Sequence, residues 1–323
     1  MPVRDFFVRV VDAMVREPRM IRNYYLGSLQ HDSLAKEAYV FMVDGRIPHG
    51  GMFDRLKGLI TIYAIAKSRN IPFRIHFTYP FRLEKYLEPN VYNWQIEDED
   101  MIFHYPESRP VIAYGEINNP IRLVKKRKGQ VHFYYGYNSL ATVNEYFHTN
   151  YDWGELYREL FRPTPYLQQY LEHYLQEAGN DYFVVHTRFM NLLGDKMETA
   201  VNPELPEVKK LGLIRGILGE IKQLNKGDDG PQNSRLMLAS DSMTFLRYAL
   251  QEFPDAYVVP GTIKHIDTAG ETNDSENVKL FTDYYLIAHS KRVYNIVADG
   301  MWPSAFPEYA AKIGGIPFKR IVL

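Results

Sequence analysis

DYFVVHTRFMNLLGDKME, residues 181–198, is the stretch of sequence that decides the fold. Its residues 182–185 are aromatic or β-branched, a pattern typical of a strand that is buried on both faces. The apolar run stops at His186-Thr187-Arg188, so a cation stands where the predicted strand leaves the core. Open α/β sheets bind ligands at the carboxyl ends of their strands, and a guanidinium suits phosphate oxygens. The stretch therefore predicts an α/β sheet with Arg188 at a ligand site, although a salt bridge at a strand end explains the tripeptide equally well.

The composition is that of an ordinary globular protein. The chain has 323 residues, of which 46% are hydrophobic and 24% charged, and its formal net charge is -1. The length allows two domains, and the charge provides no field that would attract nucleic acid or an acidic membrane. The absence of cysteine excludes disulfides, thiolate zinc sites and a cysteine nucleophile, and it fits a reducing compartment. Charges interrupt the N-terminal segment and no apolar run approaches the ~20 residues that span a bilayer, so we expect a soluble cytoplasmic enzyme of bacterial type.

Residues 1–160 predict a first Rossmann-like domain. Two apolar segments, 38–43 and 73–77, have the composition of strands, and a loop with Gly50-Gly51 and an amphipathic helix lie between them. The order strand, glycine loop, helix and strand is a βαβ unit. Glycines before a helix N-terminus let the backbone approach an anion closely, although most glycine pairs simply form turns.

Residues 161–323 predict a second Rossmann-like domain, which begins after a proline-containing linker at 161–165. A buried strand at 236–239 ends at the SDS tripeptide 240–242, where Asp241 or Ser242 can cap the following helix. Further strands are expected at 257–259 and 293–296.

Three motifs in the same order resemble those of the superfamily of fucosyltransferases that use GDP-fucose. The tripeptide at 186–188 looks like the H-x-R motif of that superfamily, whose arginine grips the donor pyrophosphate. The resemblance gives that role to Arg188 and implies that His186 orients Arg188 or binds phosphate. Many members have a second arginine at the next position, where this chain has Phe189, so the subfamily stays open. The resemblance implies a GT-B-like α/β fold, with a cleft between an acceptor-side domain (1–160) and a nucleotide-sugar donor domain (161–323).

The second motif is the glycine loop of the first domain. Gly50 and Gly51 resemble the Gly-rich strand-to-helix turn of the family, and Asp54 stands where many members have asparagine. An ionised aspartate only accepts hydrogen bonds, so we expect Asp54 to cap the helix or to bind a sugar hydroxyl rather than phosphate. Arg55 could reach the pyrophosphate, or it could form a surface salt bridge.

The third motif lies near the C-terminus, and two acidic residues precede it. Ser304 and Phe306 match an S/T-x-F turn that opens a helix, and helix N-termini bind phosphate. Asp241 matches a family element that ends a second-domain strand, although helix capping explains it as well. In the family an acidic residue from this region reads the guanine edge, and the resemblance makes Asp267 the candidate for that role. Trp302 either stacks on the nucleotide or fills the core, with the core favoured. The resemblance also includes Gly314-Gly315.

The resemblance implies an inverting glycosyl transfer that needs no metal and no cofactor besides the GDP-sugar co-substrate. The acidic segments 98–100 and 228–229 do not follow buried strands, so they read as solvated turns rather than as a metal-binding D-x-D. Arg188 would then stabilise the leaving diphosphate. A base must accept the proton of the glycan hydroxyl, and Glu198 is the first candidate and Asp195 the second. Two alternatives stay open: transfer from another GDP- or UDP-linked sugar, and a non-catalytic homologue that binds a glycan or a nucleotide.

Overall fold

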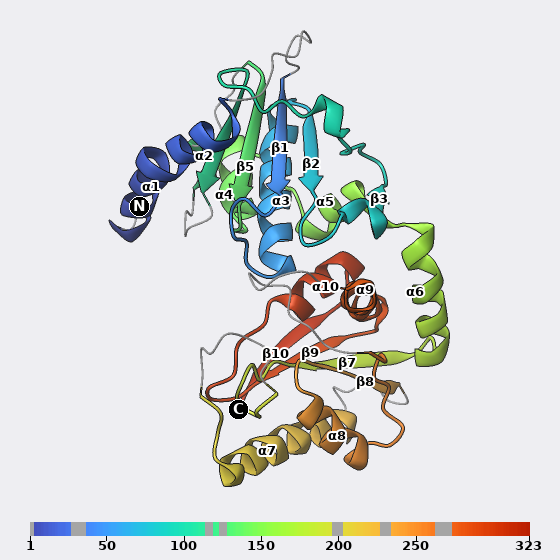
Figure 1. Cartoon of the computed structure of the whole chain (residues 1–323). Helices are drawn as coiled ribbons and strands as arrows, with labels where there is room; N and C mark the ends of the chain where they lie inside the picture. Colours follow the sequence, from blue (N-terminus) through green and yellow to red (C-terminus); the bar gives the residue numbers. More distant parts are fainter. Residues whose placement is uncertain are drawn as a thin grey trace. The chain divides into compact units, whose positions relative to one another are not determined.

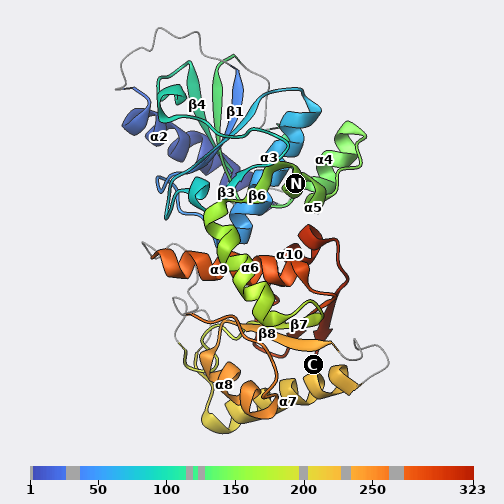
Figure 2. The ribbon, with the colours of Figure 1, turned by 90° about the vertical axis from the view of Figure 1, so that its right-hand side faces the viewer.

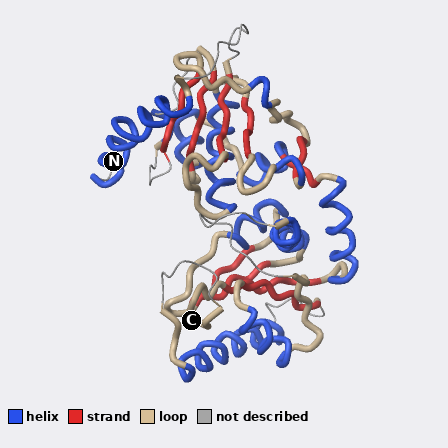
Figure 3. The backbone as a smooth tube through the Cα atoms, viewed as in Figure 1, coloured by secondary structure: helices blue, strands red, loops and turns tan. Residues whose placement is uncertain are grey.

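The computed structural model describes residues 3–26, 37–113, 119–122, 128–195, 203–226, 234–261 and 273–323. The chain divides into two units, the first formed by Met1–Arg162 and the second by Pro163–His265 together with Thr272–Leu323. Each unit is built on a four-stranded sheet with helices packed against it (Figures 1 and 3). The boundary falls between Arg162 and Pro163, where the sequence predicted one between 160 and 161.

The sheet of the first unit is parallel and mostly buried. Its strand order is β2 (Phe73–Phe77), β1 (Ala38–Val43), β5 (Gln130–Tyr135) and β4 (Ser108–Ala113). Every residue of the two central strands is buried, as expected for a parallel sheet that is covered on both faces. The long helix α3 (Met52–Ser68) comes so close to β5 that a Cβ on Gly58 would lie 2.0 Å from the carbonyl oxygen of Tyr135. Only glycine permits this approach.

Shorter elements complete the first unit. Strand β3 (Leu87–Pro89) pairs with β6 (Phe161–Pro163) in a small second sheet. The remaining elements are α1 (Val3–Val11), the π-helical segment η1 (Asp12–Arg16), α2 (Glu17–Tyr24), the 3-10 turns η2 (Leu83–Lys85), η3 (Asp98–Asp100) and η4 (Pro120–Arg122), α4 (Leu140–Phe147) and α5 (Trp153–Leu160). The predicted acidic turn at 98–100 is η3, which has no buried residue.

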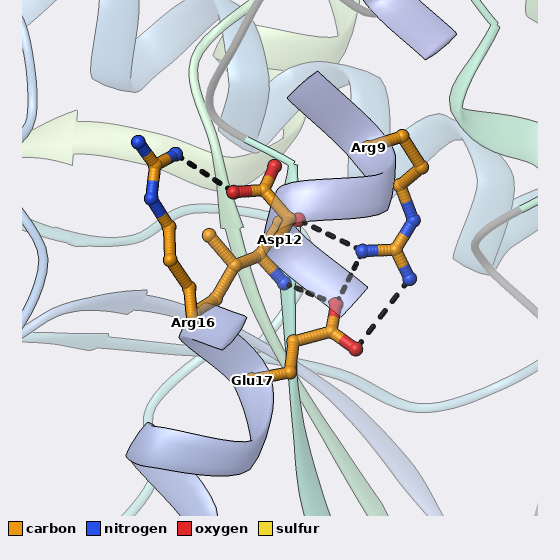
Figure 4. A network of polar contacts seen from close by, with 5 residues as sticks. Arg9, Asp12, Arg16 and Glu17 are labelled. Atoms are coloured by element: carbon orange, nitrogen blue, oxygen red, sulfur yellow. Dashed lines mark hydrogen bonds and ion pairs between the residues drawn. The ribbon is translucent and has the colours of Figure 1, made fainter. Parts of the chain in front are cut away.

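A side-chain pair from the N-terminal helices covers the free edge of β4 (Figure 4). Glu17 accepts a hydrogen bond from the backbone nitrogen of Ile112 at 3.0 Å, and Arg9 donates to the carbonyl oxygen of Ile112 at 3.3 Å. Arg9 and Glu17 also form an ion pair at 2.6 Å, and Arg16 pairs with the buried Asp12 at 2.7 Å. The pair therefore satisfies the backbone groups of Ile112 that an added strand would otherwise bind.

The sheet of the second unit is also parallel. Its strand order is β10 (Phe318–Val322), β9 (Val293–Val297), β7 (Tyr182–Thr187) and β8 (Arg235–Ser240). Two helices, α7 (Glu207–Lys226) and α8 (Met243–Glu252), cover one face, and α9 (Asp274–His289) and α10 (Phe306–Gly314) cover the other (Figures 1 and 2). Helix α6 (Pro165–Ala178) packs beside α9. The core between the sheet and α7 and α8 includes Phe183, Val185, Ile217 and Leu238.

The strand predictions for the second unit differ from the structure at two places. The expected strand at 257–259 is a single bridge, in which Tyr257 pairs with Met237 beside β8. Strand β10 was not predicted, because its residues are mostly exposed and show no alternation of polar and apolar residues. Among the helices in the described ranges, none has the length and apolar character needed to cross a bilayer.

Candidate functional site

The candidate site lies where β7, β8 and β9 end in the second unit. Because parallel strands bring their carboxyl ends to one edge of a sheet, the segments that follow these strands are neighbours. Thr187, the last residue of β7, donates to the hydroxyl of Ser240, the last residue of β8, at 3.0 Å. The backbone nitrogen of Trp302, in the segment after β9, donates to the carbonyl oxygen of Arg188 at 3.3 Å. The SDS tripeptide 240–242 and the segment of the predicted C-terminal motif therefore both adjoin the H-x-R tripeptide.

Asp241 fixes the backbone directly after Arg188. Its two carboxylate oxygens accept hydrogen bonds from the backbone nitrogens of Phe189 and Met190, both at 2.8 Å. Met190 has a left-handed φ of 56°, a conformation that ordinary residues seldom adopt, and the carboxylate stabilises this turn. The expectation that Asp241 caps the following helix is wrong: Ser242 is the N-cap of α8 and accepts from the backbone nitrogen of Phe245 at 3.0 Å.

Phe189, the residue directly after the H-x-R tripeptide, occupies a core position that does not suit a second arginine. Its side chain is fully buried and packs on Phe245 of α8, with ring centroids 5.0 Å apart. An arginine would have to bury its charge at this position, which is costly without a partner. Arg188, by contrast, is only partly buried. The turn thus directs Phe189 into the core and leaves Arg188 as the cation of the motif.

His186 is a buried, neutral imidazole. Its ring stacks on Phe306 of α10, with centroids 5.7 Å apart and an interplanar angle of 27°. Burial, together with the positive charges of Arg188 and Arg320, lowers the pKa of His186 to about 3. The imidazole can therefore donate or accept a hydrogen bond at neutral pH, but it carries no charge to add to that of Arg188.

The segment before α10 agrees only in part with the predicted phosphate turn. Ser304 is buried, and its hydroxyl oxygen accepts from the backbone nitrogen of Phe306 at 3.2 Å, so that N–H already has a partner. Trp302 is 51% exposed, so the expectation that it fills the core is wrong. Gly314 and Gly315 have structural roles: a Cβ on Gly314 would lie 2.0 Å from the carbonyl oxygen of Ala288, and Gly315 ends α10 with a φ of 64°.

The glycine loop of the first unit is held by Arg55. The guanidinium is buried and donates to the carbonyl oxygens of Gly50 at 3.0 Å and Tyr79 at 3.1 Å, so a surface salt bridge is excluded. Gly51 is the N-cap residue of α3. Asp54 does not cap the helix as expected, because its carboxylate pairs with Lys57 at 2.9 Å and is half exposed.

Of the two candidate bases, Asp195 lies among the described residues and Glu198 does not. The carboxylate of Asp195 accepts hydrogen bonds from the backbone nitrogen of Thr244 at 3.1 Å, from its hydroxyl at 3.0 Å and from the hydroxyl of Ser242. These contacts make Asp195 a cap of α8 and argue against a role as base. Glu198, and the guanine-reading candidate Asp267, lie outside the described residues.

A small, partly open pocket of about 90 Å³ lies at the carboxyl end of β8. Its walls come from β8, α8 and α9 and from the segment that follows the Tyr257 bridge; they include Ala239, Met243, Val259, Gly261 and Lys279. Lys279 is buried and pairs with Asp283 at 2.6 Å. Within the described ranges, no group of three or more histidine, aspartate or glutamate side chains could hold a metal ion.

Solved structures of fucosyltransferases have this fold. The NodZ α-1,6-fucosyltransferase co-crystallised with GDP superimposes with a TM-score of 0.55 at 14% identity, covering 85% of this chain and 92% of the other. The fucosyltransferase NodZ from Bradyrhizobium gives 0.52 at 14% identity over the same shares of the two chains. An arginine-to-lysine mutant of FUT1 from Arabidopsis thaliana in complex with GDP gives 0.57 at 10% identity, covering 95% of this chain and 73% of that one. The sequence itself matches no protein-family profile and no curated protein.

These similarities define the class of fold. The chain is an α/β protein with two Rossmann-like units, of the GT-B-like fold class that the sequence predicted, and the resemblance to GDP-fucose-dependent fucosyltransferases is confirmed at the level of the fold. Two polar residues in the sheet beside His186 were not predicted: Asn295 of β9 pairs with His186, and Arg320 of β10 pairs with Asn295. Asn295 gave a signal, a single amide within the apolar strand VYNIV, whereas Arg320 stands in a strand that the sequence did not reveal.

Proposed function

We propose that this protein is a glycosyltransferase that transfers fucose from GDP-fucose to a hydroxyl of a glycan, with inversion at the anomeric carbon and without a metal. The observation that supports this most is the turn after β7, in which Asp241 fixes the backbone next to Arg188. A cation that must meet a diphosphate repeatedly in one geometry needs such preorganisation.

In the proposed reaction the glycan oxygen forms a bond to the anomeric carbon of fucose while the bond from that carbon to the diphosphate oxygen breaks. The electron pair of the breaking bond leaves with GDP, and Arg188 stabilises the charge that grows there. The proton of the hydroxyl passes to a base, for which Glu198 is the candidate, since the carboxylate of Asp195 is already bonded to α8. A single donor of this kind is typically worth about 2.7–4 kcal/mol of barrier.

We assign the donor to the second unit, residues 161–323, and the acceptor to the first, residues 1–160. In the second unit the mostly apolar pocket at the end of β8 and the exposed indole of Trp302 are surfaces suited to a base and a ribose, and the backbone of Trp302 is bonded to that of Arg188. Asp267 stays the candidate that reads the guanine edge. In the first unit Gly50 and Gly51 form the turn before α3 that would approach the sugar or its phosphate.

Binding of nucleotides measured by thermal unfolding tests the proposal. GDP at 100 times its Kd should raise the free energy of unfolding by about 2.7 kcal/mol, and UDP and ADP at the same concentration should raise it far less. Stabilisation by UDP alone would instead favour transfer from another nucleotide sugar. Binding of GDP-fucose without release of GDP, with or without a panel of glycans, would favour a non-catalytic binding protein.

A further inference from the structure

The buried amide of Asn295 is the feature from which the inference starts. Asn295 is the central residue of β9, has no exposed surface and is flanked by apolar residues in the strand. A buried amide costs free energy unless it is hydrogen-bonded, so an apolar residue would be the ordinary choice here. The register of the sheet pairs Asn295 with His186 of β7 on one side and with Arg320 of β10 on the other. The three side chains therefore stand in one row across the sheet.

The hydrogen bonds along this row fix the orientation of the amide. The guanidinium of Arg320 donates from Nε to the amide oxygen of Asn295 at 3.0 Å. The amide nitrogen of Asn295 donates to the backbone carbonyl oxygen of His186 at 3.2 Å. A guanidinium can only donate and a carbonyl can only accept, so both neighbours require the same orientation, and the turned amide would face each with the wrong group.

The orientation of the amide in turn determines which nitrogen of His186 carries the proton. The same amide nitrogen lies 3.3 Å from Nδ1 of the imidazole. Because that amide nitrogen has only hydrogens to offer, Nδ1 must accept, and the single proton of the neutral ring stands on Nε2. Other contacts hold Arg320 in place: it donates to the carbonyl oxygen of Ser304 at 3.1 Å and lies 3.5 Å from the carboxylate of Glu308.

We infer, building on the function proposed above, that Asn295 and Arg320 are positioning residues that hold His186 as the neutral Nε2–H tautomer, so that the ring donates a hydrogen bond to an oxygen of the donor nucleotide. An Nε2 lone pair in the same place would repel the anion that Arg188 attracts. The charged groups that act on the imidazole are Arg188 at the end of its own strand and Arg320 from β10. On the side of α9 and α10 the ring meets Phe306, behind which lies the buried phenol of Tyr284.

The tautomer can be measured without any ligand, in long-range proton–nitrogen correlation spectra of the full chain labelled with ¹⁵N in histidine. The signals of His186 are those that disappear in His186→Gln. At neutral pH we expect a protonated Nε2 and a bare Nδ1. In Asn295→Asp a carboxylate oxygen replaces the amide nitrogen, so Nδ1 should become protonated. Glu308→Gln is the matched control, since it weakens the outer contact of Arg320 and an ion pair with Lys312 on α10 but leaves the bond from Arg320 to Asn295 in place, and its spectrum should equal that of the wild type.

A protonated Nδ1 in the wild-type protein, or an unchanged pattern in Asn295→Asp, would overturn the inference. Should Asn295→Asp not fold, Arg320→Met replaces it: the amide then loses one of the two groups that fix its orientation, and the Nδ1–H tautomer of His186 should become detectable beside the Nε2–H tautomer. A single Nε2–H form in Arg320→Met would show that Arg320 plays no part.

Calorimetric titration with GDP connects the tautomer to the nucleotide. Near pH 8, Asn295→Asp should bind GDP roughly 10–100-fold more weakly than the wild type, the range expected when a charge-assisted hydrogen bond is lost. As the pH falls, its ring gains a second proton and Nε2 donates again, so the ratio of the two affinities should approach one. Because GDP changes protonation equally in both titrations, the ratio of the two affinities cancels that effect. A constant ratio would contradict the role of Nε2–H, whereas failure of the wild type to bind GDP would reject the proposed function and leave the measured tautomer standing.

Discussion

The carboxylate of Asp241 lies 2.8 Å from the backbone nitrogen of Phe189, a residue 52 positions earlier in the chain. Its second oxygen holds the next backbone nitrogen, that of Met190. A single buried side chain from the end of β8 thus determines the path of the chain immediately after Arg188. The geometry of the cationic group therefore depends on a residue that need not touch a ligand itself.

Asp241→Asn is predicted to weaken GDP binding although the charge of Arg188 is untouched. The amide can accept from only one of the two backbone nitrogens, so the other loses its partner at a cost of about 1–3 kcal/mol, and the turn next to Arg188 relaxes. Calorimetric titration with GDP and thermal unfolding measure the two effects. Ser242→Ala is the matched control: it removes the cap of α8 at a cost of about 1 kcal/mol and leaves the turn intact. Equal GDP affinities of the two variants would contradict a positioning role for Asp241.

Arg188→Ala is predicted to abolish most of the turnover while the protein stays folded. Loss of about 2.7–4 kcal/mol of transition-state stabilisation corresponds to a decrease of roughly 10²–10³-fold in kcat/KM. Arg188→Lys should recover only part of it, since an ammonium lacks the planar fork of donors. The rate of GDP release from GDP-fucose is the readout. A lysine variant as active as the wild type would show that charge alone suffices.

Asp195→Asn is predicted to affect stability rather than chemistry. Since the carboxylate caps α8 through Ser242 and Thr244, the substitution should cost about 0.5–2 kcal/mol of unfolding free energy. The loss of a general base would instead lower kcat by 10²–10⁴-fold. Denaturant unfolding and kcat are measured on the same preparation, with Glu198→Gln alongside. A large loss of kcat in the Asp195 variant alone would reverse the order of the two candidates.

Trp302→Ala is predicted to weaken nucleotide binding without unfolding the second unit. The indole is half exposed, and its backbone nitrogen is bonded to Arg188, so a base or ribose held beside Arg188 can stack on it. Stacking of an aromatic side chain on a base is worth about 1–3 kcal/mol. Tyr146→Ala removes another exposed ring, on α4 of the first unit, and should leave the affinity for GDP unchanged. Identical affinities of the two variants would exclude Trp302 from the site.

The stability of the protein is predicted to fall as the pH decreases below about 6.5. Burial lowers the pKa values of His49, His132 and His186 to about 3 each. The unfolded chain takes up protons at the ordinary pKa of about 6.5, so between these values it binds more protons than the native state. The full contribution is present above pH 6.5 and is lost on acidification, by up to about 1.4 kcal/mol per pH unit for each histidine.

Urea unfolding between pH 8 and pH 5 measures this dependence. His132→Gln should give a shallower slope than the wild type, because one of the three groups no longer titrates. The exposed His148 serves as the control, and His148→Gln should follow the wild-type curve. A stability that stays constant from pH 7 to pH 5 would contradict the buried neutral state of these rings.

The fold and the site differ in how much of them the sequence reveals. Strand 38–43 and the first four residues of strand 182–187 are continuous apolar runs, and such a run is a local property of the sequence that tertiary contacts do not change. The partners of single polar side chains depend on the register of distant strands. In the sequence Asp241 looks like a helix cap, because it precedes a helix. Its bond to Phe189 forms only because β7 and β8 pair in the sheet. For Arg55 the sequence offered a contact with the pyrophosphate or a surface salt bridge, and its bond to the carbonyl group of Tyr79 was missed for the same reason, because Tyr79 is 24 residues away.

The side-chain pair on Ile112 has a consequence for anyone who shortens this chain. Arg9 and Glu17 imitate, with a guanidinium and a carboxylate, the donor and acceptor that a neighbouring strand would supply. Deletion of the first two dozen residues would remove both side chains and leave the backbone groups of Ile112 unsatisfied at the edge of the sheet. The exposed edge could then pair with another copy of the chain, so we expect the shortened protein to aggregate although it keeps every strand of the sheet.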